Sequence, residues 1–187
     1  ISAYYGAMSD GRIKFDWTIW PRYVRYPVSV ADANLGSRHA TGYEAFSQSA
    51  LALLRQTVAT RDYSLVLFAP PPQTRREQIG TGFLRFATAD EPFGATVLDG
   101  VAYAQDRPYL IAAHEIGHLM GLADLYAYDS ADQNAAGAGT RTSAMSEFRF
   151  MGVFDLMNFA IGPGLELTAW NRWIIGATLD SQMRCLP

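Results

Sequence analysis

The sequence predicts an α+β fold in which a twisted mixed sheet carries helices. The chain has 187 residues, of which 49% are hydrophobic and 18% charged, and this composition is typical of a packed globular unit rather than a disordered chain. Short apolar runs with strand-like alternation are interspersed with longer runs of helical spacing. Their order, which is strand, helix, strand and then an antiparallel pair, indicates a mixed sheet with helices.

Two strands and a helix are expected in the first third of the chain. Every second residue of 13–19 is large and apolar, which predicts a strand over 12–20. A second strand is expected over 23–30, at a sheet edge because Pro27 interrupts it. Thr41 and Glu44 have the spacing of a capping box, which predicts a helix from about Gly42 to Thr60.

The middle and end of the chain alternate between strands and helices. Residues 64–69 form an apolar run that stops at three prolines, as expected of a strand buried on both faces. Residues 79–87 and 95–104 are expected to be strands around a turn at 91–94. Helices are expected over 109–120, before Gly121, and over 165–175. The last helix would have its apolar residues on one face: Leu167, Trp170, Trp173 and Ile174.

Charge, cysteine and hydropathy exclude several classes of protein. The net charge is −3 and the 15 Lys and Arg residues are scattered, so no nucleic-acid partner is expected. Cys185 is the single cysteine, which excludes an intramolecular disulfide and a multi-cysteine zinc site. No apolar run approaches the ~20 residues of a membrane span.

A histidine pair on the helix over 109–120 carries the strongest chemical signal. His114 and His118 are four residues apart, so they lie on one helix face and can bind one Zn²⁺ together. Glu115 is then placed where it can take a proton from a metal-bound water. The alternative is a charged turn on a solvent-exposed helix face. The almost wholly apolar sequence around the motif argues against that alternative, because buried imidazoles and carboxylates need partners.

The third ligand is expected to be Asp124. Extended motifs continue with a glycine that ends the helix and turns the chain, so that a residue three positions later reaches the metal. Gly121 and Asp124 occupy these positions, and a carboxylate is an acceptable zinc ligand. His39 lies far upstream in a polar segment and is expected at the surface, whereas Glu147 or Glu166 would suit a class in which a downstream helix supplies the ligand.

A methionine is also expected beneath the metal. Proteins with extended motifs have a tight turn whose methionine forms an apolar floor, and Met157 in the segment Phe-Asp-Leu-Met-Asn is the candidate. Met157 as an ordinary core residue is the alternative, and Met145 and Met151 are other candidates for the floor.

Three segments resemble the immune inhibitor A family of secreted bacterial metallopeptidases, in the metzincin class. These segments are the motif with its continuation (114–126), the methionine segment (154–158) and the final helix (167–176). The opening residues, 4–17, are similar to the family's first strand. Snapalysin-like enzymes share the aspartate-terminated motif and are the nearest alternative.

The resemblance implies a metzincin-like zinc peptidase of two lobes. Residues 1–121 would form an N-terminal lobe with the sheet and the active-site helix, and 122–187 a smaller, mostly helical or irregular C-terminal lobe. The resemblance also implies secretion, and a chain that starts at Ile1 fits the catalytic core of a longer precursor.

The resemblance assigns a role to each site residue. His114, His118 and Asp124 would bind the zinc, Glu115 would be the catalytic base and Met157 the turn methionine. Some metzincins have a tyrosine two residues after the methionine that approaches the metal, and Phe159 replaces it here. The segment after the third ligand has few carboxylates, so Ca²⁺ at Asp129 or Asp132 is a weaker expectation.

The expected function is zinc-dependent endopeptidase activity, in which metal-activated water attacks the peptide bond and Glu115 is the general base. A protein or peptide substrate would lie extended, beside an edge strand near 95–104, and Tyr126 and Arg149 are the candidates to stabilise the oxyanion. The protein is expected to act as a monomer. The alternative is a metal-binding adhesion or recognition module that has kept the metal without turnover.

Overall fold

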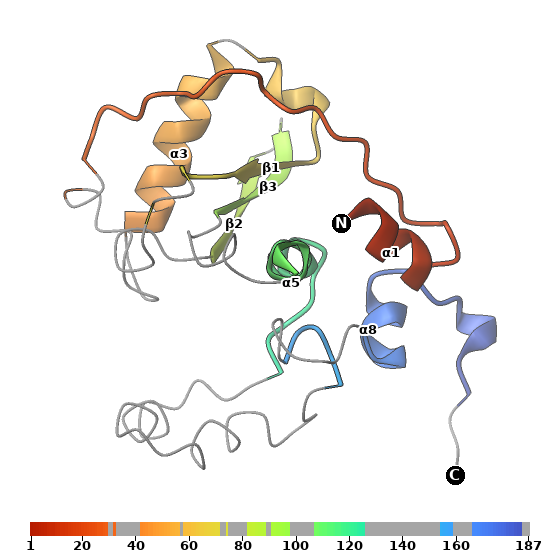
Figure 1. Cartoon of the computed structure of the whole chain (residues 1–187). Helices are drawn as coiled ribbons and strands as arrows, with labels where there is room; N and C mark the ends of the chain where they lie inside the picture. The colour runs from red at the N-terminus through yellow and green to blue at the C-terminus, as the bar shows by residue number, and fades with distance from the viewer. Residues whose placement is uncertain are drawn as a thin grey trace, which may run out of the picture. The chain divides into compact units, whose positions relative to one another are not determined.

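The structure is a computed structural model, shown in Figure 1, that describes residues 1–29, 32, 42–56, 58–71, 74, 82–88, 91–97, 107–125, 154–158 and 166–184. The chain divides into two compact units. Trp17–Leu119 form one, here called the sheet unit. Ile1–Asp16 and Met120–Pro187 form the other, the terminal unit. The division into an N-terminal lobe over 1–121 and a C-terminal lobe over 122–187 stays a prediction.

The sheet unit contains three described strands in the order β1-β3-β2. β1 (Leu65–Phe68) runs parallel to β3 (Glu91–Val97), with Leu65 opposite Gly94. β2 (Gly82–Thr88) runs antiparallel to β3, with Thr88 opposite Glu91. β3 therefore lies between the other two strands.

Three expectations about these strands are wrong. The four residues of β1 are half-buried, not buried on both faces. Residues 91–94, expected to form a turn, belong to β3, because their backbone pairs with β2. Residues 95–97 were expected at a sheet edge but are paired on both sides, and 98–104 lie outside the described residues.

Helices α3 and α5 pack on the strands of this unit (Figure 1). α3 (Gly42–Arg55) begins where its capping signal predicts but ends before Thr60, which starts the 3-10 turn η1 (Thr60–Asp62). α3 contacts β2. Its Phe46 ring makes edge contacts with Tyr26 and Phe68, at centroid distances of 4.8 and 5.9 Å.

α5 (Pro108–Leu119) matches the helix expected over 109–120 and contacts β2 and β3. A glycine in the central strand makes this packing close. A Cβ added at Gly94 would overlap Cδ2 of Leu119 and lie 3.1 Å from its Cγ. The missing side chain at Gly94 therefore makes room for the last residue of α5.

The predicted N-terminal strands are wrong. No strand is present over 12–20 or 23–29, and Ile19 and Tyr23 are 87% and 83% exposed. The first residues instead form α1 (Ser2–Met8), so the strand that the resemblance implied for 4–17 is also absent. An alternating apolar pattern makes a strand only where a neighbouring strand accepts its hydrogen bonds.

The terminal unit has its own small core around α1 and α8 (Ala169–Ile174). Tyr5 of α1 is fully buried, and burial, together with the neighbouring Tyr4, raises the pKa of its hydroxyl. Arg12 donates a hydrogen bond to the backbone carbonyl of Ala177, which links the N-terminal segment to the chain after α8. The short 3-10 turn η2 (Asp180–Gln182) follows.

The apolar face predicted for the final helix is wrong. Trp170 and Ile174 are 59% and 43% exposed, whereas Asn171 is buried. The helix begins later than expected, because Thr168 caps it by accepting a hydrogen bond from the Asn171 N–H at 3.3 Å. In the described part of the chain, no helix has both the length and the apolar character to cross a membrane.

Candidate metal centre

Helix α5 carries the two histidines through the interior of the protein. Pro108 is its first residue, a position where the missing N–H costs nothing. Every residue from 112 to 118 is buried. His114, Glu115 and His118 are only 6%, 8% and 4% exposed. The alternative of a solvent-exposed charged turn is therefore wrong.

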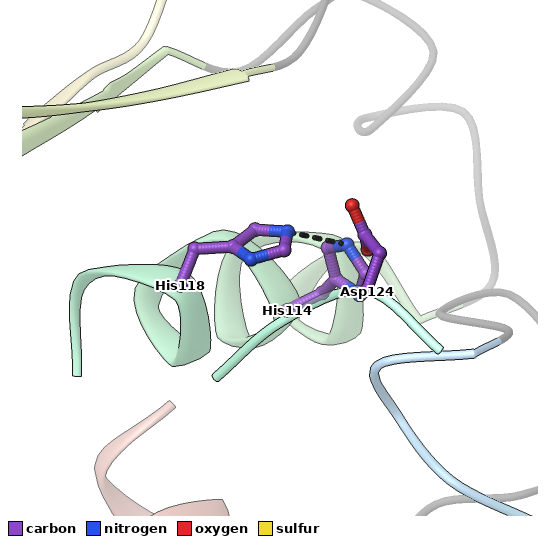
Figure 2. A group of neighbouring side chains, drawn as sticks. All are labelled: His114, His118 and Asp124. Carbon is purple, nitrogen blue, oxygen red and sulfur yellow. Dashed lines mark hydrogen bonds between the residues drawn. The ribbon is translucent and has the colours of Figure 1, made fainter. Parts of the chain in front are cut away.

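The two imidazoles point toward one another. Their Nε2 atoms are 3.2 Å apart, and the rings are nearly perpendicular, with centroids 4.7 Å apart (Figure 2). Two nitrogens bound to one tetrahedral zinc at ~2.0–2.1 Å would be about 3.3–3.4 Å apart. The observed separation matches this value, so both rings can bind one ion with little movement.

Asp124 joins the histidines through a sharp turn after α5. Gly121 has a φ of 110°, in the left-handed region that glycine adopts at helix C-termini. The chain then buries Leu122, at 3% exposure, and brings a carboxylate oxygen of the half-buried Asp124 close to the rings. The three donor atoms lie within 4.8 Å of one another. Figure 2 shows the Asp124 side chain beside that of His114.

The donor set fits a divalent cation. Imidazoles and a carboxylate buried among apolar side chains are stable only when their polar atoms have partners, and one shared cation serves all three. Two nitrogens and one oxygen leave at least one coordination position open, as in catalytic zinc sites. The same set also occurs around non-haem iron, so the donors alone do not select the metal.

Glu115 follows His114 on α5, and helix geometry places it nearer in direction to His118. At 100° per residue, its direction is about 60° from that of His118 and about 100° from that of His114. Its carboxylate is nearly as buried as the rings. A buried carboxylate beside a metal site is suited to accept and return a proton.

Met157 is fully buried in the terminal unit, in the turn over 154–158. Its backbone carbonyl accepts a hydrogen bond of 3.0 Å from the N–H of Leu125, the residue after Asp124. The predicted methionine segment therefore contacts the backbone next to the third candidate ligand. The position of the Met157 side chain relative to the metal stays a prediction.

Asp155 is a site residue that the sequence reasoning missed. Its carboxylate is fully buried and accepts the Met157 N–H at 2.7 Å. An aspartate whose side chain accepts a hydrogen bond from the backbone N–H two residues later is a known turn former, and this signal would have found Asp155.

Several other candidates lie outside the described residues: His39, Tyr126, Asp129, Asp132, Met145, Glu147, Arg149, Met151 and Phe159. Glu166 is described, and its Oε2 lies 2.7 Å from Nη2 of Arg172 in an exposed ion pair. Among the described residues, the group that can hold a metal contains Asp124 and not Glu166.

No family model, curated protein or solved structure matches this chain. The link to the immune inhibitor A family therefore depends on the motifs in the sequence.

Proposed function

We propose that the protein is a zinc-dependent endopeptidase. The observation that carries the proposal is the group of His114, His118 and Asp124, whose donor atoms lie within 4.8 Å of one another, on and after the helix that also carries the buried Glu115. A purely structural metal site needs four protein ligands and has no use for a general base, whereas the described residues supply three ligands and a nearby carboxylate in the chain that suits a base.

The site residues have two roles, metal binding and proton transfer. A zinc ion, when bound, lowers the pKa of water to about 7 and polarises the scissile carbonyl. The two histidines and Asp124 would hold that ion. Glu115 accepts the proton that the attacking water loses and donates it to the leaving amine as the C–N bond breaks. The products are a carboxylic acid and an amine, and no covalent acyl-enzyme forms.

The proposal extends to the fold and the setting of the enzyme. The motif segments support a metzincin-like, two-lobed α+β fold of the immune inhibitor A type, with snapalysin-like enzymes as the nearest alternative. They also support a secreted protein that acts on a protein or peptide substrate, with Ca²⁺ as a weaker expectation. The metal-binding adhesion or recognition module is the alternative function, and it differs by lacking turnover.

The test compares Glu115→Gln with Asp124→Asn. We expect Glu115→Gln to bind one zinc per chain but to hydrolyse a denatured protein about 10²–10⁴-fold more slowly, because only the proton transfer is lost. Asp124→Asn should lose zinc and activity together. Unchanged hydrolysis by Glu115→Gln would overturn the mechanism. A parent protein that binds zinc stoichiometrically and cleaves nothing would favour the recognition module.

A further inference from the structure

Asp155 is a fully buried carboxylate that the proposed reaction does not use. It belongs to the turn over 154–158 in the terminal unit, two residues before Met157. Burying a charged carboxylate is costly unless several donors compensate it. Its hydrogen-bond partners therefore indicate what the charge stabilises.

One carboxylate oxygen sets the shape of the turn. Oδ1 of Asp155 accepts the Met157 N–H at 2.7 Å, and the Asn158 N–H donates to the Asp155 carbonyl at 3.0 Å. These two bonds close a tight turn on itself. The direction of the Met157 carbonyl is fixed as a result.

The other oxygen joins the turn to the start of α8. Oδ2 of Asp155 accepts the Thr168 N–H at 2.6 Å. The Asn171 side-chain amide spans the carboxylate, with Nδ2 3.2 Å from Oδ1 and 3.1 Å from Oδ2. Thr168 is the N-cap of α8, so Asp155 connects two elements through one charge.

The turn over 154–158 also holds the segment that carries Asp124, the third candidate ligand. The Met157 carbonyl accepts the N–H of Leu125 at 3.0 Å, and Leu125 directly follows Asp124. A displacement of the Met157 carbonyl therefore moves the backbone from which the Asp124 carboxylate projects. This path runs through backbone hydrogen bonds within one unit.

We infer that Asp155 is a positioning residue that holds Asp124 in place for metal binding, through the Met157 carbonyl and the Leu125 N–H. The inference rests on the metal site of the proposed function. It assigns Asp155 no contact with substrate or metal.

Replacing the Asp155 carboxylate with an amide would turn one hydrogen-bond acceptor into a donor. In Asp155→Asn one acceptor oxygen becomes an NH₂ group, which then faces the N–H of Met157 or of Thr168. Two donors cannot bond to one another, so the turn or the start of α8 must move. A displaced turn leaves Asp124 misplaced, and changes to supporting residues of this kind weaken metal binding by about 10- to 100-fold.

The test measures the zinc affinity of the folded protein by competition with a chromophoric chelator. Asp155→Asn should bind zinc about 10- to 100-fold more weakly than the parent. Glu166→Gln is the matched control, since it makes the same chemical change at an exposed carboxylate in the same unit, and it should bind as the parent does. Tyr5→Ala controls for lost stability, because it removes a buried core side chain and should leave the affinity of folded molecules unchanged.

A spectroscopic readout separates positioning from general weakening. With saturating Co²⁺, the visible absorption of Asp155→Asn should shift toward that of Asp124→Asn, since both lose the carboxylate ligand. If Asp155→Asn does not fold, Asn171→Ala takes its place. It removes one donor from the carboxylate and should weaken zinc binding several-fold.

Different results would overturn the inference about Asp155 and the proposed function. Parental zinc affinity and cobalt spectrum in a folded Asp155→Asn or, in its place, Asn171→Ala would overturn the inference and leave the metal site intact. A parent that binds no zinc would overturn both. A zinc-loaded parent without peptidase activity would overturn the proposed function alone.

Discussion

Replacing Gly121 with alanine tests how the chain turns from α5 to Asp124. Gly121 has a φ of 110°, and a residue with a Cβ in such a conformation pays about 1–3 kcal/mol. Alanine also lowers the conformational entropy of the unfolded chain, which raises the free energy of unfolding by about 0.4–1 kcal/mol. If the turn keeps its conformation, the net loss in the free energy of unfolding is about 0–2.6 kcal/mol with a midpoint near 1.3 kcal/mol, and at this chain length the midpoint lowers the melting temperature by about 3–5 °C.

The same substitution should weaken metal binding. Strain that the metal-free backbone at residue 121 releases no longer lowers the free energy of unfolding, but it returns when Asp124 binds the metal. If all of the strain of about 1–3 kcal/mol returns on binding, the zinc affinity falls by about 5- to 140-fold and the metal-free protein is not destabilised. Thermal unfolding followed by circular dichroism measures the melting temperature, and chelator competition measures the zinc affinity.

Gly6→Ala is the matched control. Gly6 lies inside α1, and a Cβ there would meet no atom within 4 Å, so alanine should stabilise the protein by about 0.5–1 kcal/mol. The two substitutions are chemically identical and should change stability in opposite directions. The reasoning is refuted if Gly121→Ala stabilises the protein as Gly6→Ala does and binds zinc as tightly as the parent.

Two further predictions concern the packing of α5 and the alkaline limit of stability. Gly94→Ala should destabilise the protein by about 1–3 kcal/mol in urea unfolding, because its Cβ overlaps the Leu119 side chain. The double variant with Leu119→Ala should lose less than the sum of the two single changes, and strict additivity would contradict the contact. Since burial raises the pKa of Tyr5, the unfolded chain releases this proton from about pH 10 while the folded chain keeps it. Stability should then fall above pH 10, by up to about 1.4 kcal/mol per pH unit, and Tyr5→Phe should flatten that slope. Equal slopes for parent and variant between pH 9 and 11 would count against this explanation.

The candidate site was predictable because its signals are local. Helical spacing fixes the relation of His114 to His118, and a glycine at position 121 marks the end of the helix. Both depend on residues within one or two turns of each other. Asp124 follows within three residues of that glycine, so the sequence predicts its place near the histidines, although the Leu125–Met157 hydrogen bond that holds its segment joins residues far apart in the chain.

The N-terminal segments were not predictable from periodicity. Residues 12–20 alternate as a half-buried strand would, yet the structure has no strand there and exposes Trp17 at 42%. Pairing depends on distant partners that the local pattern does not contain. α1 has no such pattern, and its central residues include two tyrosines, which are modest helix formers, and a glycine, which is a poor one.

The role of Asp155 also depends on distant residues. Its turn with Met157 is local, but Thr168 and Asn171 are 13 and 16 residues away. The sequence predicts a turn at Met157, and only the folded chain shows which residues hold that turn.

The most direct test of the metal site is an anomalous-scattering map at the zinc edge, from crystals of the protein purified without chelator. The account predicts one peak per chain, bonded to Nε2 of His114, Nε2 of His118 and a carboxylate oxygen of Asp124. The absence of a peak at the two histidines, or a peak whose third protein ligand is His39, Glu147 or Glu166, would contradict it.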